Sequence, residues 1–137
     1  MLFRSPDGES AQWIASASAV CGFDHGVCSK VRHGDHDVRI TLPAGVSVQD
    51  RHVVLIDDMA SSGRTLVEAS KLLKAAGAHS VDVAVTHALF AADALDVIRA
   101  AGIEHVWSTD SVTHASNAVA LASKLKPAVQ AWLRQGR

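Results

Sequence analysis

The fold of this 137-residue chain is decided by one stretch, Val53-Val54-Leu55-Ile56-Asp57-Asp58-Met59-Ala60-Ser61-Ser62-Gly63-Arg64-Thr65. It opens with four aliphatic residues, three of them β-branched, and such a run is typical of a buried strand in a parallel sheet. Two acidic residues follow where we expect that strand to end, and then a short polar loop with one glycine. Segment 66–76 has apolar residues at helical spacing, and Gly77 after it can adopt the positive φ of a helix C-terminus. The pattern predicts a strand, a tight loop and a helix.

The predicted loop is a candidate phosphate site. A helix N-terminus points several backbone N–H groups and the positive end of the helix dipole at one place. The hydroxyl groups of Ser61, Ser62 and Thr65 would add donors. Asp57 and Asp58 would lie at the carboxyl edge of the sheet, where open α/β folds bind ligands. Carboxylates beside a phosphate suit ribose hydroxyls, or Mg²⁺ with its bound waters. The Walker A pattern is absent from the sequence, so a P-loop is not expected.

Residues 56–65 resemble the ribose 5-phosphate loop of type I phosphoribosyltransferases and of ribose-phosphate pyrophosphokinases. Both families carry two acidic residues, a short loop of small residues with a glycine, and a closing threonine. The matching residues are Asp57, Asp58, Gly63 and Thr65. Ser61 stands where the pyrophosphokinases often have Asp, and Arg64 stands where a small residue is usual. The resemblance implies a ribose 5-phosphate site made of Asp57, Asp58, Ser61, Ser62, Gly63, Arg64 and Thr65. The alternative is an ordinary βα turn after an acidic strand end.

Length and composition indicate a single globular domain that spans residues 1–137. Apolar residues make up 48% of the chain and charged residues 20%, which is typical of a folded domain. The formal net charge of −1 gives no electrostatic reason to expect nucleic-acid or membrane partners. No apolar run approaches the roughly 18 residues of a membrane helix, and the first residues lack a signal-peptide layout. We interpret Cys21 and Cys28 as reduced thiols, neither a disulfide nor a zinc site, and expect a cytoplasmic protein.

Two further segments carry the resemblance to the pyrophosphokinases. Ser5-Pro6-Asp7 matches the start of a loop that holds pyrophosphate and a metal in that family, although Glu9-Ser10 replaces a glycine pair. The resemblance implies that Asp7 binds Mg²⁺; the alternative is that it caps the following helix. Lys30 and Arg32 match a Lys-x-Arg on the family's catalytic loop, where the two cations stabilise the transferring phosphoryl groups. Electrostatics and positioning supply most of phosphoryl-transfer catalysis, which suits cations; the alternative is a pair of solvated side chains.

The region before the central stretch is expected to include a small flap. His25 to Arg32 is expected to be one strand that runs into a loop. The segment His33-Gly34-Asp35-His36-Asp37 is more typical of a flexible loop than of a metal cluster. Val38 to Leu42 alternates and indicates an edge strand of the flap. After the central helix, His87 resembles the histidine of a Thr-His segment in the pyrophosphokinases and is expected beside the site; a purely structural role is the alternative.

The remaining elements complete an α/β pattern. The expected strands are 80–87, 104–110 and 118–121, and the expected helices are 11–20, 91–101 and 124–134. Trp13, Ile14, Ala17 and Val20 or Cys21 are predicted to form the apolar face of the first helix, and Gly22 is predicted to close it. We expect Trp132 and Leu133 to pack the last helix onto the sheet, with Pro127 in or near its first turn.

The resemblance covers nearly the whole chain and matches the C-terminal half of a ribose-phosphate pyrophosphokinase. It implies a three-layer type I phosphoribosyltransferase-like α/β fold with a mainly parallel central sheet and a small flap. The implied reaction transfers the β,γ-diphosphoryl group of Mg-ATP to the 1-hydroxyl of ribose 5-phosphate and yields phosphoribosyl pyrophosphate for nucleotide biosynthesis. In the family, the N-terminal half supplies much of the ATP site and many subunit contacts. The first strand we expect here is Leu2-Phe3-Arg4, and no part of that half is expected before it.

Two other functions stay open at the level of sequence. The chain is either active or a catalytically silent half-domain that binds ribose 5-phosphate or a full-length partner. A phosphoribosyltransferase is a further alternative, although the nucleobase hood is missing and Lys30-x-Arg32 favours the pyrophosphokinases. We expect a homo-oligomer or association with a full-length homologue, because a half-enzyme exposes apolar surface where its other half would pack.

Overall fold

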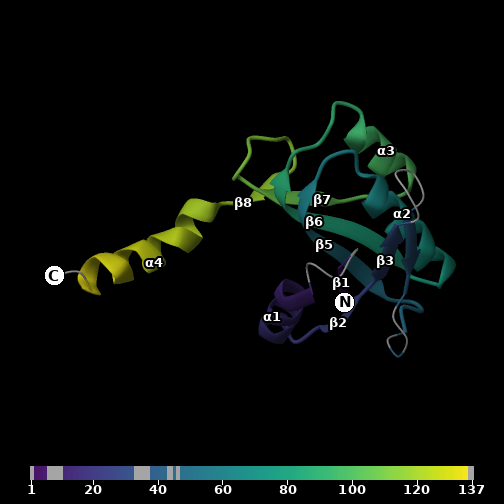
Figure 1. Cartoon of the computed structure of the whole chain (residues 1–137), viewed down its shortest axis with the longest axis horizontal. Helices are drawn as coiled ribbons and strands as arrows, with labels where there is room; N and C mark the ends of the chain where they lie inside the picture. Colours follow the sequence, from purple (N-terminus) through teal and green to yellow (C-terminus); the bar gives the residue numbers. More distant parts are fainter. Residues whose placement is uncertain (1, 6–10, 33–37, 43–44, 46, 136–137) are drawn as a thin grey trace.

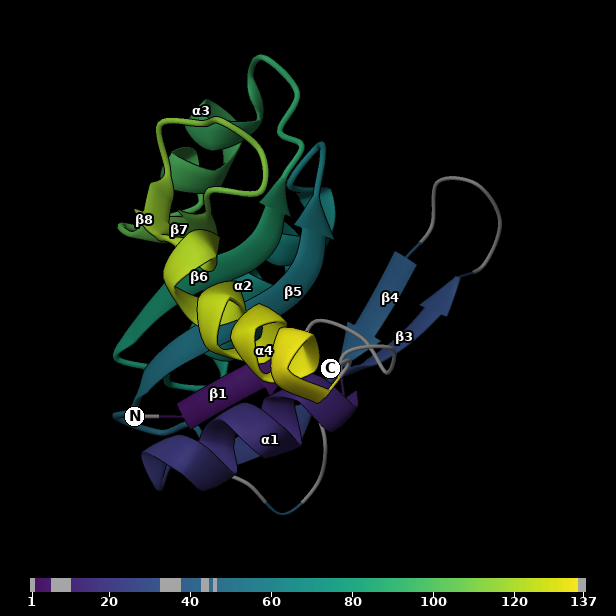
Figure 2. The same cartoon turned by 90° about the vertical axis from the view of Figure 1, so that its left-hand side faces the viewer.

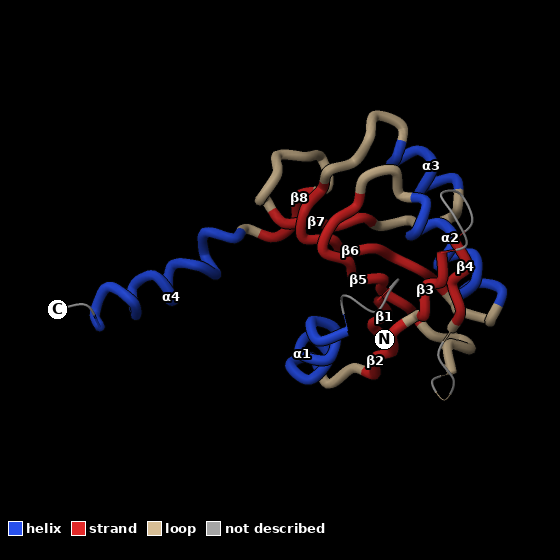
Figure 3. The backbone as a smooth tube through the Cα atoms, viewed as in Figure 1, coloured by secondary structure: helices blue, strands red, loops and turns tan. Residues whose placement is uncertain are grey.

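The computed structural model describes residues 2–5, 11–32, 38–42, 45 and 47–135 (Figure 1). Its strands are β1 (Leu2–Ser5), β2 (Asp24–Val27), β3 (Ser29–Arg32), β4 (Val38–Thr41), β5 (His52–Ala60), β6 (Ser80–Ala88), β7 (Val106–Thr109) and β8 (Asn117–Val119). Its helices are α1 (Ala11–Cys21), α2 (Arg64–Ala75), α3 (Ala94–Ala100) and α4 (Leu121–Gln135). Strands and helices alternate from β5 to β7, which confirms the α/β class (Figure 3).

Six strands form the central sheet in the order β2-β1-β5-β6-β7-β8, and all of its paired strands run parallel. The pairing of β5 with β6 extends from His52 opposite Ser80 to Ala60 opposite Ala88. β3 and β4 form a separate antiparallel pair, which is the expected small flap. The prediction of one strand from His25 to Arg32 was wrong, because the chain changes sheets between β2 and β3.

The hydrophobic core lies between the sheet and the helices α2 and α3. Alternate residues of the central strands are buried on this face, among them Val53, Leu55, Val81 and Val83. α2 and α3 cover them with Leu66, Leu73 and Ile98, each at most 1% exposed. α1 lies on the other side of the sheet and contacts β1 and β2 (Figures 1 and 2). Helices on both faces give the three layers of a phosphoribosyltransferase-like fold.

α1 begins and ends close to the predicted bounds, but its buried face is narrower than expected. Ile14 and Ser18 are buried, and Ala17 is half-buried. Trp13 is 62% exposed and Val20 88%, and Cys21 is exposed as well, so the prediction that they belong to the packed face was wrong. The physical reason is that α1 contacts only the two strands at one edge of the sheet, so a narrow stripe of the helix is covered. Gly22 ends the helix with φ +66°, as predicted.

α4 departs most from the sequence prediction. It projects away from the rest of the molecule (Figure 1) and has no buried residue. Trp132 is 71% exposed and Leu133 56%, so the prediction that they pack onto the sheet was wrong. The helix also starts at Leu121, which places Pro127 in its interior rather than in its first turn. α4 follows β8, the strand at the edge of the sheet, and does not connect two neighbouring strands within the described residues as α2 does.

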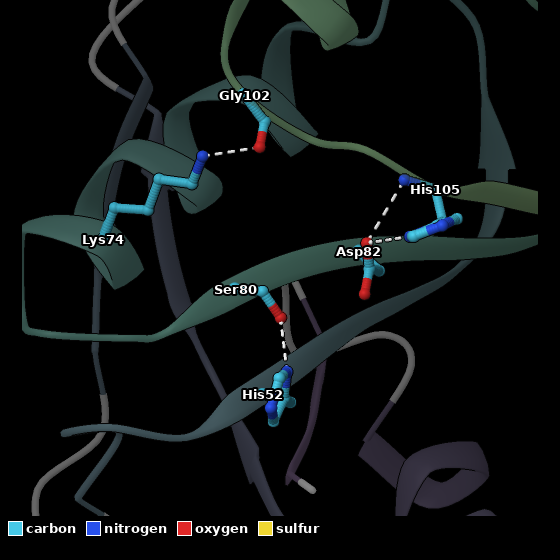
Figure 4. A network of polar contacts seen from close by, with 6 residues as sticks. All are labelled: His52, Lys74, Ser80, Asp82, Gly102 and His105. Carbon is cyan, nitrogen blue, oxygen red and sulfur yellow. Dashed lines mark hydrogen bonds and ion pairs between the residues drawn. The ribbon is translucent and has the colours of Figure 1, made fainter.

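Polar side chains at the amino ends of the central strands are already paired (Figure 4). These contacts join His52 to Ser80, His105 to Asp82, and the Nζ of Lys74 to the carbonyl oxygen of Gly102, at 2.8, 3.0 and 2.6 Å. They connect β5, β6, α2 and the segment before β7. These hydrogen bonds stabilise the amino edge of the sheet. Ligands of open α/β folds bind at the carboxyl edge, which is where the candidate site lies.

Candidate functional site at the carboxyl edge of the sheet

The site begins where β5 passes into α2. β5 extends to Ala60, so Asp57 and Asp58 lie inside the last third of the strand, where it still pairs with β6, rather than after it. The chain then bends at Ser61 and Ser62, and α2 begins at Arg64. The helix starts two residues earlier than segment 66–76 predicted, so Arg64 and Thr65 belong to its first turn. The predicted order of strand, tight loop and helix is confirmed, with a loop of only three residues.

Gly63 makes the tight bend possible. Its backbone is left-handed, with φ +72°, which a residue with a Cβ adopts only at a cost. A Cβ added there would lie 2.8 Å from two side-chain carbons of Ile98 in α3, too close for contact without movement. Its carbonyl oxygen accepts the N–H of Val67 at 3.0 Å and closes the first turn of α2. The glycine is therefore required both by the turn and by the packing of α3.

The bend encloses a pocket of about 270 Å³ lined by the continuous segment 57–66. Ser61, Ser62 and Arg64 are exposed at its rim, and Thr65 is half-buried. Among the hydrogen bonds between described residues, none uses the backbone N–H groups of residues 61–64. The amino end of α2 and the N–H groups of residues 61–64 thus belong to the pocket lining and have no protein acceptor among the described residues. This is the arrangement that binds a phosphate group.

The two carboxylates are held by the backbone that follows each of them. The N–H of Asp58 donates to Oδ1 of Asp57 at 3.0 Å, and the N–H of Met59 donates to Oδ1 of Asp58 at 2.7 Å. Each bond fixes one carboxylate oxygen of its aspartate. Both aspartates border the loop pocket, so a sugar phosphate seated there would place its hydroxyl groups near them.

A second pocket of about 340 Å³ adjoins the first, because Asp57 and Asp58 line both. Its other described walls are Trp13 of α1, Ile56 of β5, and Thr86 and His87 of β6. Trp13 thus lies at the site and not in the core. Sequence reasoning missed Trp13 because an apolar residue at helical spacing indicates burial.

His87 lines the second pocket together with Asp57 and Asp58. It is opposite Met59 in the β5–β6 pairing, and its Nδ1 is 2.9 Å from the Oγ of Ser111. The Ser111 hydroxyl also donates to the carbonyl oxygen of Thr86 at 3.0 Å. These bonds hold the imidazole at the carboxyl end of β6. Ser111 was not singled out from the sequence, although it belongs to the polar run after β7.

For the other predicted site residues, the structure gives at most the position of the backbone. Lys30 and Arg32 lie two positions apart in β3 of the flap, opposite Ile40 and Val38. Asp7, the predicted Mg²⁺ ligand, lies outside the described residues, as does the segment His33–Asp37. Neither the exposed Cys21 nor the buried Cys28 forms a disulfide between described residues. The roles of all these residues stay predictions.

The parallel sheet, the phosphate-type loop after its central strand and the acidic pair beside that loop define a type I phosphoribosyltransferase-like protein. The chain belongs to the phosphoribosyl synthetase-associated domain family, whose model matches residues 36–131. Among its relatives is ribose-phosphate pyrophosphokinase 1 of Archaeoglobus fulgidus, which is 38% identical over 126 residues. That alignment covers 88% of this chain and 43% of the relative. The ribose-phosphate pyrophosphokinase of Methanopyrus kandleri is 33% identical over 130 residues, covering 95% and 44%.

Solved structures show the same fold. Phosphoribosylpyrophosphate synthetase from Mycobacterium smegmatis superposes with a TM-score of 0.73 at 23% identity, covering 98% of this chain and 45% of that chain. Orotate phosphoribosyltransferase from Aeropyrum pernix gives a TM-score of 0.58 at 17% identity over 78% of this chain. The chain thus spans somewhat less than half the length of the pyrophosphokinases that it matches. None of the helices in the described ranges combines the length and the apolar character needed to cross a membrane.

Proposed function

We propose that this chain holds the ribose 5-phosphate site of a ribose-phosphate pyrophosphokinase. One observation supports this most strongly: residues 57–66 line a pocket at the start of α2, and the backbone N–H groups of residues 61–64 in that lining donate to no acceptor among the described residues. A phosphate monoester fits this pocket because the donors and the helix dipole both favour an anion. Ser61, Ser62, Gly63, Arg64 and Thr65 would bind the phosphate, and Asp57 and Asp58 would bind the ribose hydroxyl groups or a metal.

In the proposed reaction, the 1-hydroxyl oxygen of ribose 5-phosphate attacks the β-phosphorus of ATP. The bond between that phosphorus and the α–β bridging oxygen breaks, AMP leaves, and the hydroxyl proton is lost to the solvent or to a base. Mg²⁺ would neutralise the charge of the phosphates. Oxygen ligands suit this ion, which keeps several waters and uses one or two carboxylates. Asp57, Asp58 and the predicted ligand Asp7 provide such oxygens, whereas no ready cluster of three His, Cys, Asp or Glu side chains occurs in the described ranges.

The test of this function is an assay of the purified chain with Mg-ATP and ribose 5-phosphate. AMP formation would support the enzymatic proposal, and calorimetric titration of ribose 5-phosphate, with and without Mg-ATP, would report on the site itself. Binding without AMP formation would favour the alternative of a catalytically silent half-domain. No binding of ribose 5-phosphate would contradict the proposal. Conversion of a labelled nucleobase would instead favour a phosphoribosyltransferase.

Lys30 and Arg32 would stabilise charge that develops on the diphosphoryl group during transfer. Replacement of Lys30 by alanine should therefore lower turnover by about 100-fold or more and change the affinity for ribose 5-phosphate less than about threefold. The matched control is Lys126→Ala, which removes a lysine from the exposed helix α4. Equal losses of turnover and affinity in the Lys30 variant would argue against a role in the transition state.

We also propose that the chain works in the cytoplasm as a homo-oligomer or together with a full-length homologue. The support is the exposed apolar stripe of α4, made of Leu125, Val129, Trp132 and Leu133. Contiguous apolar surface of this kind is typical of a protein interaction site. Sedimentation of the chain, alone and mixed with a full-length relative, measures the association directly.

A further inference from the structure

One face of the central sheet, along β5 to β8, has no covering helix among the described elements. α2 and α3 pack on the opposite face, and α1 packs on β1 and β2 at one edge. The uncovered face presents the side chains of Ile56, Ala84, Trp107 and Val119, which line a pocket of about 190 Å³. Trp107 is 36% exposed and Val119 44%. Both faces of a parallel sheet are normally covered, so this apolar face is suited to a further packing element.

The second uncovered apolar surface of the chain is the stripe on α4. Its residues Leu125, Val129, Trp132 and Leu133 recur at helical spacing, and each is more than half exposed. α4 leaves the molecule on the same side of the sheet as α1, which is the side of the uncovered face (Figures 1 and 2). At about 1.5 Å per residue, its 15 residues span about 22 Å, whereas four strands spaced by about 4.8 Å are about 14 Å across. The helix is therefore long enough to cross such a face.

The start of α4 is held by hydrogen bonds that fix its direction. Ala120 alone separates β8 from α4, whereas βα connections usually have about two to six residues. The N–H of Leu121 donates to Oδ1 of Asp110 at 2.8 Å, and the N–H of Asp110 donates to the carbonyl oxygen of Val119 at 3.0 Å. These bonds tie the beginning of the helix to the end of β7. To lie on the sheet of its own chain, α4 would have to break them and reverse its direction within one residue.

Charge favours contact between the two apolar surfaces. α4 has no acidic residue and three cationic ones, Lys124, Lys126 and Arg134. Among the described residues that line the pocket on the uncovered face there is no lysine or arginine, and one is Asp57. Asp82 lies on the same face, two positions before Ala84 in β6. A basic helix therefore suits this face, whereas contact between two α4 helices would bring like charges together.

We propose that the uncovered face of β5 to β8 is the docking surface for α4 of a second copy of this chain. Two copies related by a two-fold axis would each place α4 on the sheet of the other, so the contact is made twice and the pair is closed. The inference rests on the proposed self-association of the chain and adds the surface that receives α4. A helix stripe on four strands is a small interface, so we expect a dissociation constant on the order of tens of micromolar, and a monomer in dilute solution.

Sedimentation equilibrium of the full chain, over a series of concentrations, tests the docking with two matched pairs of variants. Val129→Glu adds a charge to the apolar stripe of α4, and Ala131→Glu adds the same charge to its polar face. Val119→Glu adds a charge to the uncovered sheet face, and Ala118→Glu adds it to the other face of β8. All four residues are exposed, so the variants are expected to fold. Val129→Glu and Val119→Glu should each weaken dimerisation about tenfold or more, and the two controls less than about threefold.

A mixture of the two disrupted variants tests which surfaces meet. The intact α4 of the Val119→Glu chain can still dock on the intact sheet face of the Val129→Glu chain. One of the two contacts is thus preserved, and the mixture should dimerise more tightly than either variant alone. A mixture that dimerises no better than its components would contradict the docking of α4 on the sheet.

Several other results would overturn the assignment. Loss of the dimer in Val129→Glu but not in Val119→Glu would indicate contact between two α4 helices, and the reverse would indicate contact between two sheet faces. A chain that stays monomeric well above the expected concentration range would show that no second copy docks. Self-association that none of the variants weakens would leave the homo-oligomer standing and place its interface elsewhere. Calorimetry with ribose 5-phosphate tests the loop pocket separately, so failure of the docking leaves the proposed ribose 5-phosphate site unaffected.

Discussion

Helices α2 and α4 have similar sequence patterns and opposite surroundings. Both are amphipathic, and they have 12 and 15 residues. α2 buries five residues, whereas α4 buries none. α2 connects β5 to β6, which lie side by side in the sheet, so the returning chain holds it against the core. α4 follows the edge strand β8 and has no such constraint.

The comparison shows what an amphipathic pattern can and cannot predict. The pattern predicts that a helix forms and which of its faces avoids water. It does not say what covers that face, because this depends on where the next strand lies. The apolar face of α2 packs against the protein's own sheet, and this packing also fixes the loop that begins at Ser61. In α4 the apolar face of Leu125, Val129 and Trp132 is open to a partner.

Truncation of one leucine in each helix should give the largest difference. Leu73→Ala in α2 removes a fully buried side chain and should lower the free energy of unfolding by about 2–5 kcal/mol. Leu125→Ala in α4, where the side chain is 57% exposed, should change it by less than about 0.5 kcal/mol. Urea unfolding followed by circular dichroism measures both. Similar losses in the two variants would show that α4 packs against protein in solution.

A smaller effect is expected at Gly63, where α2 begins. Gly63→Ala must adopt φ near +72° and place its Cβ against Ile98, so we expect a loss of about 1–3 kcal/mol in the free energy of unfolding. Movement of the loop should also weaken ribose 5-phosphate binding about tenfold or more, as measured by calorimetry. These changes test whether the packing under α2 sets the geometry of the site.

Gly22→Ala is the matched control for this substitution. Gly22 has nearly the same backbone conformation, φ +66°, but an added Cβ would meet nothing within 4 Å. It lies at the end of α1, so the control variant carries backbone strain without the contact to α3. Unchanged ribose 5-phosphate binding is expected in it. Equal losses of binding in the two variants would show that general destabilisation, rather than the loop geometry, is responsible.

The parts of the molecule that local pattern determines were predictable from the sequence. Strand β5, the bend and helix α2 follow from aliphatic, polar and helical runs, and Gly77 adopts φ +92° at the end of α2, as expected. The exposure of Trp13 was not predictable, because burial depends on how far α1 overlaps the sheet. The pairing of His87 with Ser111 likewise joins residues 24 positions apart, through the neighbouring strands β6 and β7. Asp7 and Lys30 were identified by resemblance, and their roles stay predictions.

The smallest effect on overall stability is expected at Pro127, which lies inside α4. A proline in a helix interior removes a backbone hydrogen bond and disfavours the helix locally by about 3 kcal/mol. Pro127→Ala should therefore raise the helical signal and slow amide hydrogen exchange in α4. The urea midpoint of the core should stay within error of the unchanged chain, because α4 buries no side chain in the core.

Lys126→Ala, at a neighbouring exposed position, controls for the loss of a side chain without removal of the proline. If Pro127→Ala shifted the unfolding of the core while Lys126→Ala did not, the two helices would be coupled, and α4 would be part of the folding unit that α2 completes.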